Sequence, residues 1–432
     1  MQIYSFLELL QFARQHSPFY RELYKTLGES PKLEELPIVD SVSFWAANGP
    51  VDNQVLTSRQ RDGLVFKSGG TSGNAKFSYF AKEEWDHLNS VFGLSLGRGG
   101  LKDGERLANF FYAGDLYASF IFIMRSIEAS GRQVLRLPLG GTADSDNILK
   151  TLNEFQVDVW AGPPTTLMKI AELVKYQSGQ APRKILFGGE SFYPDQRAHL
   201  LALFPGVEIR SVGYASVDAG LIGFVDSDCG PQEHRVFSND SIVEIVDPET
   251  LEPIHQPQQT GKILLTNRAR LLMPIIRYPV GDLGAWIEPE SVHHERKFKI
   301  LGRSEEGARV GPTTIYYDDL AACLQLHQHQ LQASGFQLVI RHFDKLDQLI
   351  VRVARNISGQ NDSGQNISDR LSAADFAKQL EHDRPVLKQL AQDKKLHPVH
   401  VEFVEAADLS VQKRTGKLKR IIDERFLVKF QP

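Results

Sequence analysis

The sequence predicts an α/β protein with a large N-terminal domain and a smaller α+β C-terminal domain. Between residues 106 and 214, strand and helix patterns alternate, which favours mainly parallel sheets with helices on both faces. Short apolar segments without intervening helices follow at residues 241–301 and indicate a small β subdomain. Beyond Gly302 the pattern changes to strands followed by a helix, which places a domain boundary near Arg303.

The first hundred residues are expected to be helical at both ends and loop-like between. Residues 1–23 have the spacing of an amphipathic helix, and Glu8 and Arg14 interrupt the apolar run that a signal peptide needs. Proline and glycine punctuate residues 36–53 and predict a loop. In residues 81–97 the apolar side chains recur at helical spacing.

The alternating region divides into short elements at its turn residues. Gly131 is expected to stop one helix, and Ser145 or Asp146 is expected to cap the next. The expected strands are 106–112, 132–139, 157–162, 184–190 and 208–214. The expected helices are 116–131, 145–155, 165–179 and 195–206.

The second half of the chain is expected to be richer in strands. Residues 356–369 repeat Ser, Gly, Gln and Asn without large apolar side chains other than Ile, and predict a mobile surface loop. The expected strands are 241–247, 261–267, 298–301 and 399–405, together with a β-rich stretch at 336–355. A helix is expected at 372–395 and a basic tail at 412–426.

Composition disfavours several classes of function. The 432 residues carry 49 basic and 53 acidic side chains, well mixed, whereas nucleic-acid binding normally needs a basic face. Cys229 and Cys323 lack metal-ligand spacing and are expected to be ordinary reduced thiols. The most apolar stretch, residues 108–124, contains Asp115 and is too short for a membrane span. A cytoplasmic location is expected.

The segment FKSGGTSGNAKFSYF, residues 66–80, has the composition of a polyphosphate cradle. Its glycines allow backbone N–H groups to converge, its hydroxyls add donors, and its lysines add positive charge. The spacing differs from the Walker A loop, from GxGxxG and from GxSxG. A flexible surface loop is the alternative interpretation. The residues concerned are Lys67, Ser68, Gly69, Gly70, Thr71, Ser72, Gly73 and Lys76.

This segment is the first of several motifs that stand in a fixed order. Together they resemble the acyl-adenylating (AMP-forming) enzyme superfamily, and within it the phenylacetate–CoA ligase-like branch. The others are FGGE at 187–190, VGYASVDAG at 212–220, MPIIRYPVGDLG at 273–284, ILGRSEEG at 300–307 and RTGKLKR at 414–420. The resemblance covers nearly the whole chain.

The resemblance implies ATP-dependent activation of a carboxylic acid as an acyl-adenylate, with release of pyrophosphate and transfer to CoA or another acceptor. It implies ATP and Mg²⁺, with CoA as a candidate cosubstrate. It also implies an adenylate-forming domain with the ATP and carboxylate site at 1–302 and a mobile domain at 303–432. The expected partners are therefore small molecules, with no nucleic acid and no membrane span, and a homodimer is an expected assembly.

The resemblance assigns roles to individual residues. Lys417 would be catalytic, and Asp218 would bind the metal. The acid would contact Phe111, Tyr112 and Gly188, and the aromatic side chains of Phe110, Phe111, Tyr112 and Trp160 suggest an aromatic acid. The nucleotide would contact Ser68, Gly69, Gly70, Thr71, Ser72, Gly73, Lys76, Gly189, Glu190, Tyr214, Ala215, Ser216, Asp282 and Arg303.

Each of the main residues also has a purely structural interpretation. Tyr214 could be a core aromatic, Asp282 a turn cap and Lys417 a solvated cation. Lys419 is a rival for the role of Lys417, although the preceding Gly416 favours Lys417.

Departures from the family pattern keep two other functions open. Val217 stands where a hydroxyl is usual and Asp218 where a glutamate is usual, while Ala75 replaces a proline and Glu305 and Glu306 replace aspartates. Pro312 stands where relatives often have a glycine beside the pantetheine tunnel. The alternatives are transfer to a non-CoA amine, hydroxyl or carrier-protein acceptor in secondary metabolism, and a non-catalytic protein that binds a nucleotide or acyl-adenylate.

Overall fold

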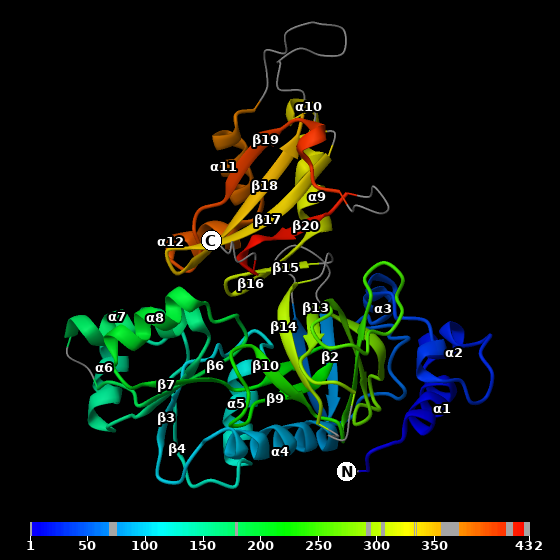
Figure 1. The fold of residues 1–432 in the computed structure, drawn as a ribbon, viewed down its shortest axis with the longest axis horizontal. Helices are drawn as coiled ribbons and strands as arrows, with labels where there is room; N and C mark the ends of the chain where they lie inside the picture. The colour runs from blue at the N-terminus through cyan, green and yellow to red at the C-terminus, as the bar shows by residue number, and fades with distance from the viewer. Residues whose placement is uncertain are drawn as a thin grey trace, which may run out of the picture. The chain divides into compact units, whose positions relative to one another are not determined.

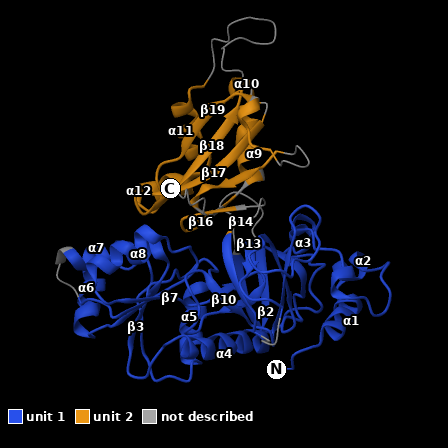
Figure 2. Ribbon diagram, viewed as in Figure 1, with its two compact units in different colours: residues 1–68, 75–301 blue, residues 69–74, 302–432 orange. Residues whose placement is uncertain are grey.

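The structure is a computed structural model, and it divides into two compact units (Figure 2). Unit 1 comprises Met1–Ser68 and Ala75–Leu301, and unit 2 comprises Gly69–Asn74 and Gly302–Pro432. The described residues are 2–68, 76–177, 180–290, 295–303, 307–331, 333, 335–355, 371–411 and 418–426.

Unit 1 contains a five-stranded parallel sheet in the order β4-β3-β5-β6-β7 (Figure 1). Its strands are β3 (Arg106–Asn109), β4 (Leu135–Pro138), β5 (Val159–Gly162), β6 (Lys184–Phe187) and β7 (Glu208–Ser211). The helices connected with it are α4 (Lys82–Arg98), α5 (Ser119–Glu128), α6 (Ser145–Glu154), α7 (Pro164–Gln177) and α8 (Pro194–Leu203).

Helices cover both faces of this sheet because successive strand residues point to opposite sides. Val159 and Ala161 of β5 join the apolar cluster that includes α4 and α5. Trp160, between them, joins the cluster that includes α6, α7 and α8. A strand buried on both faces must be apolar throughout, which explains the unbroken apolar run of this segment.

Unit 1 also contains a seven-stranded sheet in the order β11-β12-β13-β14-β10-β9-β8 and a β1–β2 hairpin. The strand pairs for which a register is given are antiparallel. This β subdomain is therefore larger than the three segments that the sequence suggested. The strands are β1 (Gly63–Ser68), β2 (Lys76–Ala81), β8 (Tyr214–Ser216), β9 (Gly220–Phe224), β10 (Glu233–Val236), β11 (Ser241–Val246), β12 (Gly261–Asn267), β13 (Ile275–Trp286) and β14 (Lys297–Arg303).

The N-terminal helices pack on the antiparallel sheet. Leu9, Tyr20 and Phe44 are fully buried in one cluster with Ile263 and Ile276 of the sheet. The Tyr20 hydroxyl donates to the Pro274 carbonyl oxygen at 2.8 Å, so its polar end is satisfied within the core. These elements are α1 (Phe6–His16), α2 (Pro18–Leu23), η1 (Leu33–Glu35) and α3 (Ser41–Ala47).

The chain passes from the parallel to the antiparallel sheet at Gly213. The sequence predicted one strand over 208–214, but β7 ends at Ser211 and the chain enters β8 at Tyr214. Gly213 has a φ of 126°, and a Cβ there would lie 2.9 Å from the Phe92 ring of α4. Only glycine fits this transition, because both the backbone angle and the close approach exclude a side chain.

Unit 2 is built on a four-stranded sheet in the order β19-β18-β17-β20, with a β15–β16 hairpin. Phe376 and Leu380 of one helix pack on Leu338 and Val351 of the sheet in a single apolar cluster. The strands are β15 (Gly307–Val310), β16 (Thr313–Tyr316), β17 (Gly335–Phe343), β18 (Leu346–Ala354), β19 (His400–Val404) and β20 (Ile421–Asp423). The helices are α9 (Tyr317–Leu326), α10 (Gln328–Leu331), α11 (Ala373–Asp383), α12 (Pro385–Gln392), η2 (Ala406–Asp408) and η3 (Glu424–Phe426).

The fold class is confirmed, while several element boundaries differ from the expectation. The cap of α6 is Asp144, whose carboxylate accepts from two backbone N–H groups, and neither Ser145 nor Asp146. The helix expected at 372–395 is two helices, because Pro385 cannot continue α11 and instead starts α12. The loop expected at 356–369 lies outside the described residues. Among the residues described, every helix is too short or too polar to cross a lipid bilayer.

Candidate active site

The carboxyl end of β6 carries the glycines of the FGGE motif. A Cβ on Gly188 would lie 2.6 Å from a Val212 methyl group and 3.5 Å from the Phe111 ring, so this glycine is required by close packing. Gly189 has a φ of 77°, and no atom lies within 4 Å of a Cβ built on it. The backbone here is therefore open on one side, which suits a flat ring lying against it. Glu190 follows, and both of its carboxylate oxygens accept from Thr165 at the start of α7.

Tyr214 and Asp282 meet in the antiparallel sheet. The Tyr214 hydroxyl donates to an Asp282 carboxylate oxygen in a short hydrogen bond, although 68 residues separate them in the chain. The Tyr214 ring also lies tilted against His234 and Phe298, with centroid distances of 5.8 and 6.2 Å. Asp282 is 8% exposed. This pair presents a hydroxyl and a carboxylate side by side, a combination suited to binding the hydroxyl groups of a sugar.

Asp218 lies in the turn between β8 and β9, close to β2. The Ser78 hydroxyl of β2 donates to its Oδ1 at 3.2 Å. In the same turn, the Ser216 hydroxyl oxygen accepts from the Ala219 backbone N–H at 2.9 Å. Ala215 packs, partly buried, against the cluster that contains Phe111. The turn thus brings a carboxylate next to the strand that follows the glycine-rich segment.

Lys76 begins β2, directly after the glycine-rich segment. Its ammonium group lies 5.4 Å from the centroid of the Trp45 ring of α3. The Trp45 indole N–H donates to the Tyr278 hydroxyl at 3.0 Å, which fixes the ring. The aromatic face thus holds the cationic end of this side chain against α3.

The residues expected around the acid separate into two groups. Phe111 is 3% exposed and packs beside Gly188, and the Tyr112 hydroxyl lies 3.2 Å from the Thr166 hydroxyl. Phe110 and Trp160 are fully buried in the cluster on the other face of the parallel sheet. Of these side chains, Phe111 adjoins Gly188, whereas Phe110 and Trp160 lie in the cluster on the opposite face.

Several predicted site residues cannot be located. Gly69, Gly70, Thr71, Ser72, Gly73 and Lys417 lie outside the described residues. For Ser68 and Arg303 the backbone is described, within β1 and β14, and the side chain is not.

Two buried groups near the site have shifted pKa values. Burial lowers the pKa of His234 to about 4, against a smaller opposite effect of its hydrogen bond to the Gln232 carbonyl. Burial also lowers the pKa of Arg270 to about 10, partly offset by the negative charges of Glu84 and Asp218. His234 is therefore neutral and Arg270 is charged at neutral pH.

The sequence reasoning missed Ser78, His234 and Arg270. The available signal for Arg270 was a basic residue directly before the apolar run of Leu271, Leu272 and Met273. A charge at the edge of such a run is either exposed or buried with defined partners. His234 had no comparable signal, since alternating strands carry histidine on either face.

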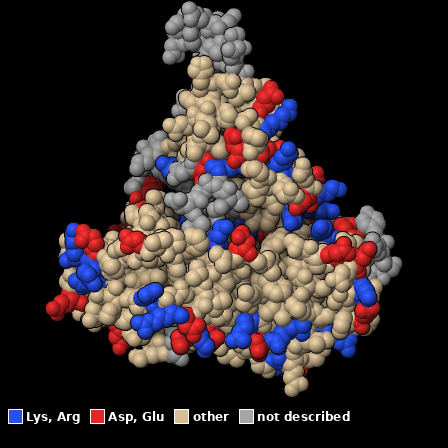
Figure 3. All heavy atoms as spheres, turned by 180° about the vertical axis from the view of Figure 1, so that it is seen from behind, with Lys and Arg blue, Asp and Glu red and all other residues tan. Residues whose placement is uncertain are grey.

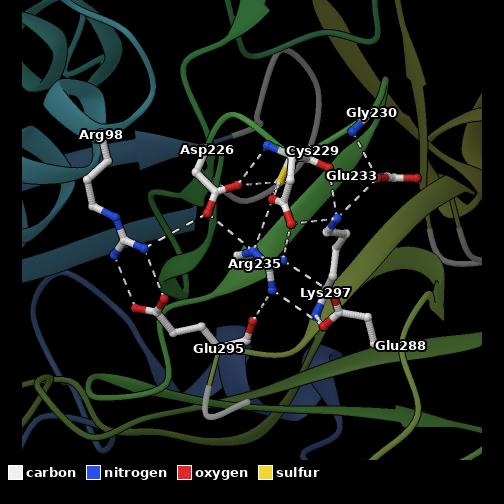
Figure 4. A network of polar contacts seen from close by, with 10 residues as sticks. Arg98, Asp226, Cys229, Gly230, Glu233, Arg235, Glu288, Glu295 and Lys297 are labelled. Carbon is white, nitrogen blue, oxygen red and sulfur yellow. Dashed lines mark hydrogen bonds and ion pairs between the residues drawn. The ribbon is translucent and has the colours of Figure 1, made fainter.

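Charged groups outside this site form a network around Arg235 of β10 (Figure 4). Asp226, Asp228 and Cys229 have ligand-type atoms within 4.8 Å of one another. Arg235 pairs with both aspartates, and Lys297 pairs with Asp228 at 3.2 Å. Protein cations already neutralise these carboxylates, so we assign the network a structural role.

The outer surface carries both signs of charge. On the face drawn in Figure 3, Lys and Arg side chains are interspersed with Asp and Glu side chains. The chain has 49 basic and 53 acidic residues, in agreement with this mixed distribution.

The residues present fit a nucleotide and a divalent cation. The open backbone at Gly189 leaves room for a base, the Tyr214–Asp282 pair suits a ribose, and Asp218 supplies the carboxylate oxygen that Mg²⁺ prefers. Bound there, the cation would offset phosphate charge.

Comparisons with known proteins show that the chain is similar to proteins named as ligases and synthetases. No protein-family model matches it. A phenylacetate-coenzyme A ligase of Aromatoleum evansii is 22% identical over 439 residues, which cover 97% of this chain and 93% of that protein. An indoleacetate–lysine synthetase of Pseudomonas savastanoi is 26% identical over 251 residues, covering 57% of this chain and 58% of that protein.

A solved structure shares the fold across nearly the whole chain. The crystal structure of 2-hydroxyisobutyryl-CoA ligase in complex with 2-HIB-AMP and CoA has a TM-score of 0.67 with 18% identity. The match covers 97% of this chain and 89% of that chain.

Proposed function

Because the chain belongs to the acyl-adenylating superfamily, in its phenylacetate–CoA ligase-like branch, we propose that it activates a carboxylic acid with ATP. The carboxylate attacks the α-phosphorus, an acyl-adenylate forms, and pyrophosphate leaves. The acyl group then passes to CoA or another acceptor. The carrying observation is that separate motifs meet within unit 1. Tyr214 bonds Asp282, and Gly188 of the FGGE motif packs against Val212, two residues before Tyr214.

Each of the described site residues would have its own role in this reaction. Asp282 would hold the ribose, the Tyr214 ring would stack on the adenine, and Gly189 would lie against the same base. Asp218 would hold Mg²⁺, directly or through a water molecule, so that the repulsion between carboxylate and triphosphate is reduced. Bound substrates held in this geometry react with a smaller entropic barrier.

Lys417 is proposed as the catalytic cation, and Ser68 to Lys76 as the cradle of the β- and γ-phosphates. Residues 1–302 would form the adenylate-forming domain and residues 303–432 the mobile domain. These assignments extend the resemblance of the motifs at 66–80 and 414–420.

Pyrophosphate exchange into ATP tests the proposal. Phenylacetate, indoleacetate and a panel of aliphatic acids are supplied with and without Mg²⁺. We expect acid-dependent exchange that falls about 100-fold or more in Lys417→Ala, the usual loss for one transition-state charge contact. Lys419→Ala is the matched control and should keep the exchange. Thermal stabilisation by ATP without exchange would instead support a non-catalytic binding protein.

A second candidate is transfer to an amine rather than to CoA. Two observations favour it: the partial relative is named a lysine synthetase, and Pro312 stands beside the tight turn at Gly311, which has a φ of 51°. Incubation of the enzyme with acid and ATP, then separately with CoA and with free amino acids, distinguishes the two by product mass. A thioester supports the CoA ligase, and an amide supports the synthetase.

We propose an aromatic acid as the substrate because the aromatic side chains of Phe111 and Tyr112 would contact it. The same exchange panel tests this proposal.

A cytoplasmic location is proposed because Cys229 and Cys323 are both free thiols, and cell fractionation tests it. A homodimer is also proposed, which light scattering of the purified chain tests.

A further inference from the structure

Arg270 is a buried cation in the segment between β12 and β13. It is 1% exposed, so its guanidinium is removed from water. Burying a charge is costly unless its donors are satisfied, and such residues are retained where they hold a particular arrangement. Its partners therefore indicate what it arranges.

The guanidinium joins two separate segments of unit 1. Nη1 donates to the carbonyl oxygens of Val217 and Asp218, at 3.3 and 2.6 Å. Nη2 donates to the Tyr79 carbonyl oxygen of β2 at 2.7 Å. The planar group also lies 4.0 Å from the centroid of the Phe80 ring. The rigid, forked guanidinium of Arg270 thus fixes the turn that carries Asp218 against β2.

The same two segments are joined a second time by a side chain. The Ser78 hydroxyl, fully buried in β2, donates to the Asp218 carboxylate at 3.2 Å. β2 begins at Lys76, where the glycine-rich segment ends. The position of Asp218 relative to β2 is therefore set by two links, one through Arg270 and one through Ser78.

Arg270 is itself held in place by its neighbours. The backbone N–H groups of Leu271 and Leu272 donate to one carboxylate oxygen of Glu84, at 2.6 and 2.7 Å. The other Glu84 oxygen accepts from the Ala81 backbone N–H at 3.1 Å, at the start of α4. The backbone next to Arg270 is therefore held by Glu84, while its guanidinium is held by the carbonyl oxygens described above.

We propose that Arg270 is a positioning residue for Mg²⁺·ATP, which holds the turn that carries Asp218 in a fixed position against β2. This inference rests on the proposed function. Lysine cannot replace the fork, because an ammonium group on a flexible stem cannot bond both segments with the same geometry.

The test compares ATP binding with and without Mg²⁺ in Arg270→Lys. Calorimetry measures the affinity for ATP in EDTA and in excess Mg²⁺, and the ratio of the two is the enhancement by the cation. In the variant this enhancement should fall about 10-fold, the scale typical for loss of a group that orients a metal ligand. The affinity for ATP in EDTA should stay within about 3-fold of the wild-type affinity, a smaller change than the loss expected in Mg²⁺. The acid KM in pyrophosphate exchange should not change.

Arg277→Lys is the matched control. Arg277 is also a buried arginine, 3% exposed, but it bonds Glu244 and the backbone carbonyls of Glu34 and Leu36. It should lose stability without losing the Mg²⁺ enhancement. Equal loss of ATP affinity with and without Mg²⁺ in Arg270→Lys would overturn the proposal, as would an unchanged enhancement.

Two further variants keep the inference testable. If Arg270→Lys does not fold, Ser78→Ala removes the second link and should lower the enhancement in the same direction. Asp218→Asn separates this inference from the proposed function. If Asp218→Asn lowers the enhancement and Arg270→Lys does not, positioning by Arg270 is wrong. If the wild-type protein binds no ATP, the proposed function is wrong.

Discussion

At the scale of single residues, the Tyr214–Asp282 pair shows how one hydrogen bond prepares a site. The hydroxyl of Tyr214 restrains the Asp282 carboxylate, so less freedom would be lost on binding the ribose that we propose for this site. The order of strands in the antiparallel sheet, rather than sequence proximity, brings these side chains together.

Substitution of the two members of the pair should have unequal effects. Asp282→Asn removes a charged acceptor, worth about 1.5–3 kcal/mol, and should raise the KM for ATP roughly 10- to 100-fold. Tyr214→Phe keeps the ring and loses a restraint of about 0.5–1.5 kcal/mol, so the KM should rise roughly 2- to 10-fold. Pyrophosphate exchange at varied ATP measures both. A larger effect in Tyr214→Phe would contradict the assignment of Asp282 to the ribose.

His234 should make stability depend on pH. Its pKa is about 4 in the folded protein and about 6.5 in an unfolded chain. Between these values only the unfolded chain binds the proton, so stability is complete above pH ~6.5 and declines as the pH falls toward ~4. The loss reaches about 3 kcal/mol, at 1.36 kcal/mol per pKa unit.

Urea unfolding of wild type and His234→Gln at a series of pH values tests this expectation. The variant should show a flatter dependence in that interval. His329→Gln, which changes an exposed histidine, should retain the wild-type dependence. Parallel curves for wild type and His234→Gln would contradict the assignment.

At the scale of elements, the β15–β16 hairpin is held by a buried cluster in unit 2. Asp347 accepts from the Gly311 backbone N–H at 2.8 Å and from Arg425 at 2.6 Å. Arg425 also donates to the Arg309 carbonyl oxygen at 2.7 Å. Burial opposes the charge of Asp347, yet the hydrogen bond to His342, the charge of Arg425 and the Gly311 N–H outweigh it and lower its pKa.

Asp347→Asn should therefore destabilise unit 2 strongly. Arg425 keeps its pair with Asp423, but Arg425, His342 and the Gly311 N–H lose a buried charged acceptor, which typically costs about 1.5–3 kcal/mol. Chemical unfolding monitored in unit 2 measures the loss. Lys378→Gln breaks an exposed pair with Asp375 and should change little. Equal effects of the two substitutions would show that the cluster does not hold the hairpin.

The elements also show where sequence reasoning succeeds. The alternation over 106–214 was predicted because each strand and helix has its own period and its own punctuation. β13 was missed because Pro279, Gly281 and Gly284 read as turn residues, although they lie within a twelve-residue strand. Its neighbours on both sides supply the pairing that its own composition does not favour, and such pairing is invisible in a local pattern.

At the scale of the whole molecule, the two units have separate cores. The apolar cluster of unit 2 contains only residues between Ala308 and Ile421, and the three clusters of unit 1 contain none of them. Each unit therefore has the independent core that defines a domain.

Calorimetry should resolve two unfolding transitions. A saturating concentration of ATP with Mg²⁺ should raise the temperature of the transition that belongs to unit 1, because ligands stabilise the state that binds them. Asp347→Asn should lower the other transition and leave the first in place. A single transition, shifted as a whole by both changes, would show that the cores unfold together.

The candidate site was predictable only as far as motif order allowed. The sequence indicated Gly188, Tyr214, Asp218 and Asp282 because their motifs stand in the family's order. It did not indicate Arg270, whose role depends on a turn 52 residues earlier and on a strand 191 residues earlier. Phe110 and Phe111 are adjacent in the chain, yet they face opposite clusters, a separation that composition alone does not reveal.

The passage of the chain through Gly213 has a consequence for how this enzyme can diversify. Phe111 and Gly188 lie just after strands β3 and β6, before the crossing, whereas Tyr214 and Asp282 lie in strands after it. Under the proposed function, substitutions around Phe111 that suit a new acid can therefore accumulate beside the parallel sheet while the Tyr214–Asp282 pair, in the antiparallel sheet, is left intact. Gly213 itself should not tolerate substitution, because any side chain there would displace Phe92 and separate the two sheets.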